Sequence, residues 1–404
     1  MRTSRATPER PAVGLVLTGG GARAAYQAGV LSGILEVLDP DRTPGFRNPF
    51  AIISGTSAGA INAAALACRA HQVHRAVDHL CRLWGSLRTD DVYYSDPAHL
   101  LASGLQWLAV FGLGWIRPRL ARHHAPHSLL NNEPLVGLLT RTLNFSRLNT
   151  NLERGHLDAL AITATAYTTG EHLTFYQARQ TIKPWKRTLR RAVTGAIGVD
   201  HLMASSAIPF IFPARAVLMG DHTLWCGDGS MRQLAPISPV IHLGAKRVCV
   251  ISTNFNEEIH PEVRELNPPY PNLAQIAGHT LSNIFLDGVS VDLESTERIN
   301  SLLARIPTNG LKSESLRSIH TLTITPSRSL DELALEHLDE LPRAVRTLFR
   351  VLGISPRKVE AGSGALASYL LFESGYTRNL IALGRADGMS HAGEVIAFFK
   401  EWSA

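Results

Sequence analysis

The beginning of the chain alternates between short apolar runs and longer stretches with helical periodicity. Val13–Leu17 is an unbroken apolar run with the length of a buried strand, and a glycine turn and a helical pattern follow it. A second apolar run, Phe50–Ile53, leads into a small-residue helix that ends near Arg69. This strand–helix–strand–helix order with short connections predicts an α/β fold in which the two strands are parallel neighbours, with both carboxyl ends at one edge of the sheet.

The later part of the chain predicts further strands and then mainly helices. We expect strands at Leu157–Tyr167 and Lys246–Thr253, and two short strands around a turn within Arg215–Ser230. Ile319–Pro326 alternates like a strand and is a candidate to extend the same sheet. The pattern therefore predicts a disordered leader at 1–10, an α/β unit at 11–255 with an insertion at about 90–130, and a mostly helical region at 256–404.

Composition and charge narrow the class of protein only slightly. The chain has 404 residues, 45% hydrophobic and 18% charged, as expected of a globular protein with a sizeable core. Its net charge of +6 suits an anionic membrane surface or nucleic acid and does not choose between them. The four cysteines stand far apart, and the polar amino terminus lacks the apolar core of a signal peptide. We therefore expect reduced thiols and a cytoplasmic location.

A short motif directly after the second apolar run points to chemistry. Gly55-Thr56-Ser57-Ala58-Gly59 has the pattern Gly-x-Ser-x-Gly between an expected strand and an expected helix. There the serine sits on a sharp turn at the positive amino end of the helix, and the glycines avoid collisions with neighbouring elements. Such a pentapeptide also occurs as an ordinary tight turn, so the motif alone leaves both interpretations open.

A run of glycines after the first strand favours the catalytic interpretation. Gly19, Gly20 and Gly21, with Arg23 nearby, leave backbone N–H groups bare at the start of a helix, which suits an oxyanion. The competing interpretation is a dinucleotide-binding Gly-x-Gly-x-x-Gly loop, but Ala24 stands where its last glycine belongs. Two such loops at one sheet edge favour acyl transfer over nucleotide binding.

The general base is the harder assignment. Asp228 follows an apolar strand and is flanked by two glycines. A carboxyl group that lies in a partly dry pocket beside the serine has a raised pKa, which suits a base. Asp221 is the rival aspartate, and its surroundings indicate a hairpin turn. No histidine stands in a motif-like turn, although several are candidates for a base: His172, His201, His222, His242 and His391.

Four segments together resemble the patatin-like phospholipases in order and spacing: GGGARAAYQAGVL, GTSAGAINAA, ASSAIPFIFP and CGDGS. The resemblance covers about residues 13–253 and implies a three-layer α/β/α sandwich with a mostly parallel central sheet, related to cytosolic phospholipase A2 catalytic domains. It implies a Ser–Asp dyad without histidine, in which Ser57 is the nucleophile and Asp228 the base. It also implies an oxyanion hole formed by Gly19, Gly20, Gly21 and Arg23, and no metal or cofactor.

Two positions depart from the usual motifs of that family. Ala24 stands where a glycine is usual, and Ser230 stands where a glycine or alanine usually follows the Asp-Gly pair. Both changes are to small residues, so we expect the two loops to keep their roles.

The insertion contains an apolar segment, His99–Ile116, which arginines and histidines follow at once. Gln106 and three glycines interrupt it, which disfavours a membrane span and leaves an interfacial element, a lid or a core element as alternatives. An interfacial element would place two tryptophans near headgroups and three arginines on anionic lipid: Trp107, Trp115, Arg117, Arg119 and Arg122. His123, His124 and His127 lack the spacing of a metal-ligand set.

These features predict a serine acyl hydrolase that cleaves ester bonds of phospholipids or lysophospholipids through an acyl-enzyme. We expect a lipid substrate, a peripheral position at the inner membrane surface and no nucleic-acid partner. The alternatives are a non-catalytic lipid-binding protein on the same fold, a Ser-His-Asp esterase and an NAD-binding enzyme. The sequence leaves the head group, the acyl chain and the oligomeric state open.

Overall fold

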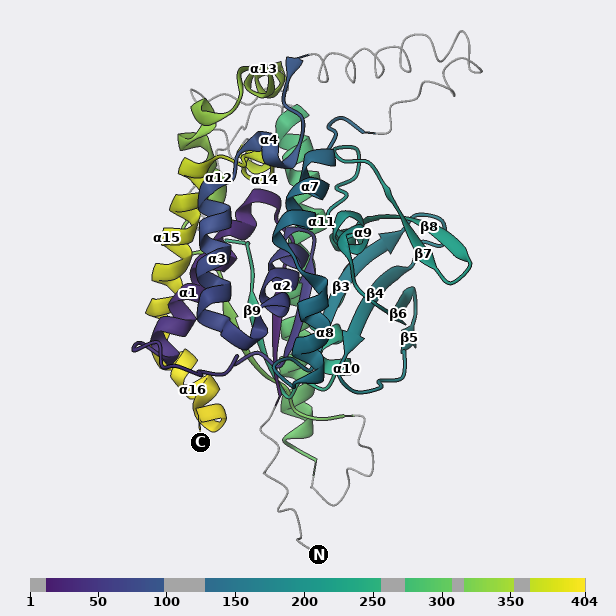
Figure 1. Cartoon of the computed structure of the whole chain (residues 1–404), viewed down its shortest axis with the longest axis vertical. Helices are drawn as coiled ribbons and strands as arrows, with labels where there is room; N and C mark the ends of the chain where they lie inside the picture. The colour runs from purple at the N-terminus through teal and green to yellow at the C-terminus, as the bar shows by residue number, and fades with distance from the viewer. Residues whose placement is uncertain (1–11, 98–127, 256–272, 307–315, 352–363, 404) are drawn as a thin grey trace, which may run out of the picture.

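The central feature of the molecule is a mixed sheet with helices on both faces (Figure 1). The computed structural model describes residues 12–97, 128–255, 273–306, 316–351 and 364–403, and the strands in this part form a ten-stranded sheet. Five adjacent strands are parallel in the order β10-β9-β1-β2-β3: His320–Ile324, Arg247–Ile251, Val13–Leu17, Ile52–Thr56 and Ala159–Ala166. The predicted α/β/α sandwich with a mostly parallel sheet is therefore confirmed.

The other strands lie on the far side of β3. β4 (His172–Ala178) pairs antiparallel with β3 and parallel with β6 (Arg190–Thr194), and β5 (Lys186–Arg187) pairs with β6. β7 (Arg215–Met219) and β8 (His222–Asp228) form a hairpin that projects from this side of the molecule (Figure 1). β8 also pairs with β3, which joins the hairpin to the sheet.

β2 extends further than the apolar run that predicted it. The strand continues from Ile52 through Thr56 because small polar residues keep pairing with β3. Ser54 lies opposite Ala161, and the hydroxyl groups of Thr56 and Thr163 are hydrogen-bonded at 2.7 Å. The ordered strand therefore ends at the residue before Ser57.

Alternate residues of the central strands face two different helical layers. Leu15, Leu17 and Ile53 pack in the larger core, whose helices include α1 (Ala25–Leu38), α2 (Ala58–Cys68), α3 (Val73–Ser86), α8 (Phe145–Glu153), α15 (Ser374–Ser390) and α16 (Ala392–Ser403). Val16 and Val250 face the opposite layer, which contains α10 (Ser238–His242) and α11 (Leu273–Leu303). The sheet is thus buried on both faces, as a largely parallel sheet must be.

Shorter helices gather near the carboxyl ends of the parallel strands, in the upper part of Figure 1. They are the 3₁₀ helix η1 (Gly21–Ala24), α4 (Thr89–Val92), α7 (Glu133–Thr142), α9 (Val199–Ser205), α12 (Leu330–Glu336), α13 (Arg343–Val351) and α14 (Ala365–Leu370). Segments from the beginning, the middle and the end of the chain therefore enclose one edge of the sheet.

The carboxyl-terminal helix α15 packs on α1 with the two backbones in direct contact. A Cβ atom on Gly29 would lie 2.1 Å from the carbonyl oxygen of Ile381, and one on Gly384 would lie 2.2 Å from that of Tyr26. The Tyr26 hydroxyl group also donates to Asp387 at 2.9 Å. The last part of the chain is therefore built into the core of the α/β unit.

Candidate active site

Ser57 lies between β2 and α2 in a backbone conformation that L-residues rarely adopt. Its φ is 55° and its ψ is −130°, and the other non-glycine residues with positive φ in the described ranges are Arg42, Leu189 and Phe210. The serine is buried at the amino end of α2, where the helix dipole favours negative charge. A strained serine at a helix start has the geometry of a nucleophile elbow.

Two glycines make this turn possible. A Cβ atom on Gly55 would lie 2.3 Å from the carbonyl oxygen of Gly59, and one on Gly59 would lie 2.4 Å from the carbonyl oxygens of Leu17 and Thr18. Gly59 therefore lets the start of α2 rest against the end of β1. The motif glycines are required by packing, as the sequence pattern predicts.

The edge of β3 brings Asp228 next to Ser57. β2 occupies this edge as far as Thr163, which lies opposite Thr56, and β8 takes over at the next residue. Asp228 lies opposite Ala164, while β4 occupies the other edge of β3. Thr56 and Asp228 are therefore consecutive along one strand edge, although they are far apart in sequence.

The end of α9 and the turn that follows it are bonded to both residues. The Ser205 hydroxyl oxygen accepts a hydrogen bond from the Ser57 N–H at 2.8 Å, and the Ala207 carbonyl accepts one from the Asp228 N–H at 3.0 Å. Sequence reasoning used this segment only as a motif and missed its role. It fixes the relative position of the serine and the aspartate.

The Asp228 carboxyl group is buried and only partly hydrogen-bonded. Its Oδ1 accepts from the Ser230 N–H at 2.8 Å, whereas Oδ2 has no hydrogen-bond partner among the described residues. Burial raises its pKa to about 6, and the nearby hydroxyl group of Ser57 lowers it by less than burial raises it. The Ser57 hydroxyl group is thus close without forming a well-aligned bond, as is common in a catalytic pair without substrate.

Close contacts on two sides hold the glycine loop after β1. A Cβ atom on Gly20 would lie 2.6 Å from Thr253 Oγ1, and one on Gly21, whose φ is +55°, would lie 2.2 Å from the Tyr369 carbonyl oxygen. The Thr253 hydroxyl group also donates to the Gly19 carbonyl at 2.7 Å. These positions exclude any larger residue, and Gly21 lines the apolar pocket beside Ser57.

Arg23 connects this loop to the carboxyl-terminal region of the chain. Its N–H donates to the Gly20 carbonyl at 3.1 Å, and the N–H groups before that bond have no partner within the helix. The buried guanidinium group pairs with Asp331, donates to Ser368 Oγ at 2.7 Å and stacks 4.1 Å from the ring centre of Tyr369. The Arg23 side chain is therefore engaged by the end of the chain.

An apolar pocket adjoins Ser57 and Gly21. The rest of its lining is Ala58, Ile61, Leu83, Trp84, Leu87, Val92, Leu135, Leu138, Leu139, Ser206, Ile208, Phe212 and Phe372. This lining suits a hydrocarbon chain and offers no charged group to a sugar or a nucleotide. Ser206 is a polar residue in this lining that the sequence did not indicate. Its buried hydroxyl group has no hydrogen-bond partner in the described ranges.

The candidate histidines lie in other surroundings. Within the described part of the chain none of them hydrogen-bonds to Ser57 or Asp228. His172 contacts the Gly229 backbone, but burial lowers its pKa to about 4 and keeps it neutral. His201 Nδ1 accepts from the Gly198 N–H at 3.1 Å. The others lie in the hairpin (His222), on the Trp185 ring (His242) and at the end of α15 (His391).

Several sequence predictions concern residues that lie outside the described ranges, namely Trp107, Trp115, Arg117, Arg119, Arg122, His123, His124 and His127. In the part of the chain that is described, no three potential metal ligands cluster together. In that same part, no helix has both the length and the apolar character needed to cross a membrane. Asp221 lies in the turn of the β7–β8 hairpin, at the opposite end of β8 from Asp228.

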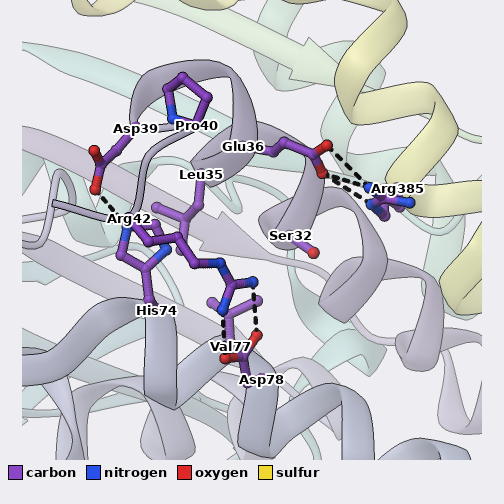
Figure 2. Close-up of a pocket in the computed structure, with 10 residues that line it drawn as sticks. All are labelled: Ser32, Leu35, Glu36, Asp39, Pro40, Arg42, His74, Val77, Asp78 and Arg385. Carbon is purple, nitrogen blue, oxygen red and sulfur yellow. Dashed lines mark hydrogen bonds and ion pairs between the residues drawn. The ribbon is translucent and has the colours of Figure 1, made fainter.

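A second hollow lies at the other end of α1 and is lined mostly by charged and polar residues (Figure 2). The Arg42 guanidinium group binds both carboxylate oxygens of Asp78 at 2.8 and 3.1 Å. Arg385 forms a similar pair with Glu36 at 2.9 Å. The first ion pair joins the loop after α1 to α3, and the second joins α1 to α15. Because these charges are paired with one another, we assign the hollow a structural role.

The fold and the site combine a serine on a strand-to-helix turn, a buried carboxyl group and an apolar pocket. The family model described as "Patatin-like phospholipase" matches residues 15–241, more than half of the chain. The chain belongs to the patatin-like phospholipase family, which confirms the resemblance seen in its motifs. No curated protein sequence matches the chain.

Solved structures with similarity to the chain are distant. Human GIVD cytosolic phospholipase A2 is 11% identical with a TM-score of 0.44, over 97% of this chain and 60% of that one. The type III effector protein ExoU is 14% identical with a TM-score of 0.33, over 96% of this chain and 54% of that one. VipD from Legionella pneumophila is 13% identical with a TM-score of 0.28, over 93% of this chain and 67% of that one. The chain thus spans 60% and 54% of the length of the first and second of these proteins.

Proposed function

We propose that this protein hydrolyses carboxylic ester bonds of phospholipids or lysophospholipids with a Ser57–Asp228 dyad and without a histidine. The observation that carries the proposal is the meeting of the two residues on one edge of β3, beside an apolar pocket. The carboxyl group of Asp228 has a pKa of about 6, so it is ionised and able to accept a proton at neutral pH.

The first half of the reaction forms an acyl-enzyme. The Ser57 oxygen attacks the ester carbonyl carbon while Asp228 accepts the serine proton. Backbone N–H groups of the Gly19–Gly21 loop stabilise the negative charge on the carbonyl oxygen. The bond to the alcohol then breaks, and Asp228 returns the proton to the leaving oxygen.

The second half releases the fatty acid. A water molecule attacks the acyl carbon and gives its proton to Asp228, and the serine oxygen leaves and recovers that proton. The hydrocarbon chain occupies the pocket between Trp84 and Phe372 on one side and the α7 leucines on the other in this proposal. Ser206, with its unpartnered hydroxyl group in the pocket, is positioned to donate to an ester oxygen.

Substitution of the dyad tests this proposal. Ser57→Ala and Asp228→Asn should each lower hydrolysis of a p-nitrophenyl ester by about a thousandfold or more while the circular dichroism spectrum stays unchanged. Because the pair acts as a unit, the double variant should be no slower than either single variant. Activity of Asp228→Asn close to that of the wild type would reject the dyad.

A histidine variant separates the dyad from a triad. His172 is the informative position because it contacts the backbone next to Asp228. His172→Gln should keep most of the activity, since its side chain makes no contact with Ser57 in the described structure. A folded His172→Gln protein as inactive as Ser57→Ala would support a Ser-His-Asp esterase instead. Binding of lipid by a wild type that hydrolyses no ester would favour the non-catalytic alternative.

A further inference from the structure

Exposed apolar side chains cluster on the loops and the hairpin at the edge of the sheet where Ser57 lies. We call these five residues the apolar rim, and their exposed fractions range from 53% to 78%: Leu189, Phe210, Leu218, Trp225 and Leu234. They belong to the β5–β6 turn, the turn after α9, the β7–β8 hairpin and the segment after Asp228. Large side chains of this type are normally buried, so their concentration at one edge needs an explanation.

Two residues of the apolar rim are held in strained backbone conformations. Leu189 has a φ of 53° and Phe210 a φ of 65°, in the left-handed region that bulky residues avoid. Glycine would occupy either position without strain. The chain therefore accepts a backbone cost at two places that also expose a large apolar side chain, a combination that points to function.

The apolar rim is connected directly to the candidate active site. Phe210 lies between Ile208 and Phe212, and both of these residues line the apolar pocket. Trp225 lies on the same strand as Asp228, three residues before it. A lipid that enters the pocket therefore passes close to the apolar rim.

The hairpin has apolar residues on both of its faces. Val217 and Cys226 point into a small core with Phe175. Leu218 and Trp225 lie on the opposite face, since side chains alternate along each strand and the pairing of Leu218 with Thr223 and of Ala216 with Trp225 puts both on the same face. A hairpin that ended in water would place polar residues on this outer face.

The β5–β6 end of the apolar rim is basic. Lys186 and Arg187 are exposed next to Leu189 and form no ion pair within the described residues. Arg191 joins this turn to the hairpin through a 3.9 Å contact with the sulfur of Met219. Asp221 is an exposed acidic residue at the hairpin tip, two residues from Met219. Unpaired cations beside exposed apolar residues are complementary to a surface that is anionic outside and apolar inside.

We propose that the apolar rim docks this protein on the surface of an anionic phospholipid bilayer. Its side chains would insert among the acyl chains, while Lys186 and Arg187 would lie at the headgroups. Apolar residues that are spread over turns and a hairpin, with cations at one end, fit a lipid surface better than the continuous flat patch of a protein interface. The biological purpose rests on the proposed lipid hydrolysis, but binding can be measured without it.

The experiment measures co-sedimentation of the full chain with vesicles in a Ser57→Ala background, so that no lipid is hydrolysed. The vesicles are an equimolar mixture of phosphatidylcholine and phosphatidylglycerol. The rim variant combines Leu189→Gly, Phe210→Gly, Leu218→Ser and Trp225→Ser, and the glycines relieve strain and so protect the fold. Its vesicle affinity should fall by about tenfold or more.

A matched control replaces exposed apolar residues elsewhere. Leu302 of α11 and Ile396 of α16 are 61% and 54% exposed and lie outside the apolar rim. The double variant Leu302→Ser and Ile396→Ser should bind vesicles as the wild type does. An equal loss of binding in the control and the rim variant would overturn the proposal, because it would show general hydrophobic adhesion.

The charged residues give a second, independent readout. Lys186→Gln with Arg187→Gln should weaken binding to the mixed vesicles several-fold and leave binding to pure phosphatidylcholine unchanged. Wild-type binding to the mixed vesicles should also weaken as salt is raised. Unchanged binding of the rim variant, or no binding by the wild type, would overturn the proposal. A wild type that instead dimerises through these residues in sedimentation would assign the rim to self-association.

The same proteins with Ser57 restored separate docking from catalysis. The rim variant should hydrolyse a soluble short-chain ester at the wild-type rate and vesicle lipid more slowly. A wild type that binds vesicles but hydrolyses no ester would reject the proposed function and leave the docking surface intact.

Discussion

At the scale of single residues, the site depends on one carboxyl group that folding places in an unfavourable position. Asp228 is buried without a countercharge among the described residues, and burial raises its pKa to about 6. A buried carboxylate is costly unless it is paired or fully hydrogen-bonded, and Oδ2 has no partner. The protein therefore gives up stability at the position where the proposed mechanism places a base.

The raised pKa predicts how activity depends on pH. As a base Asp228 must be ionised, so kcat/KM should rise with unit slope up to about pH 6 and level off above it. The measurement is a pH profile for a soluble ester whose own ionisation is constant over that range. A plateau that extends unchanged below pH 5 would contradict the assignment of Asp228 as the base.

The same pKa predicts the stability of Asp228→Asn. The folded-state pKa lies above the ordinary value of 3.8, so the stability contribution of Asp228 is complete at low pH and is lost as pH rises through about 6. The inactive variant should therefore exceed the wild type in free energy of unfolding by about 3 kcal/mol above pH 7 and by little below pH 4. Denaturant unfolding at both pH values checks this, and a variant that is less stable at neutral pH would contradict it.

At the scale of elements, the turns around the sheet edge are fixed by close backbone contacts. Gly59→Ala should lower stability by roughly 1–3 kcal/mol, because its Cβ atom would meet two carbonyl oxygens at 2.4 Å and push α2 away from β1. Hydrolysis should fall about a hundredfold or more, since Ser57 begins the same helix. Gly393→Ala is the matched control, because its Cβ atom meets nothing within 4 Å. Equal activity of the two variants would refute the packing argument.

The contact between Arg23 and the carboxyl-terminal region predicts a catalytic effect at a distance. Arg23→Lys keeps the charge but loses the forked bonding to Asp331 and Ser368 and the stacking on Tyr369. The glycine loop should then be held less firmly, so kcat should fall about tenfold with little change in KM. Steady-state kinetics on a soluble ester test this. A change confined to thermal stability would show that the contact is purely structural.

These elements also show how far the sequence alone could predict the site. The Gly-x-Ser-x-Gly turn and the glycine run are local patterns, so their positions and backbone demands follow from neighbouring residues. The bonds from Ser205 and Ala207 to the serine and the aspartate depend on three segments that meet only in the folded chain. Sequence patterns do not encode such distant contacts, and the extension of β2 through polar Ser54 also depends on its partner strand.

At the scale of the whole molecule, the carboxyl-terminal region belongs to the same folding unit as the site. Phe372 lines the apolar pocket, and α15 packs on α1 through Gly29 and Gly384. A protein that ends at residue 363 should therefore fail to fold and should accumulate as insoluble material. Solubility and limited proteolysis of the shortened chain check this. A soluble, active product would show that 364–404 is an independent addition.

The sharing of one edge of β3 by β2 and β8 has a consequence for comparing relatives of this protein. The distance between Ser57 and Asp228 is set by two adjacent positions of β3, Thr163 and Ala164, and by the bonds from Ser205 and Ala207, and the lengths of the loops between these segments do not enter. Insertions and deletions in those loops leave the proposed pair unchanged, whereas a slip of β8 by one residue would put a glycine in place of the carboxyl group. A search for members of this family should therefore allow any spacing between the serine and aspartate motifs and hold fixed the alignment of each motif to β3.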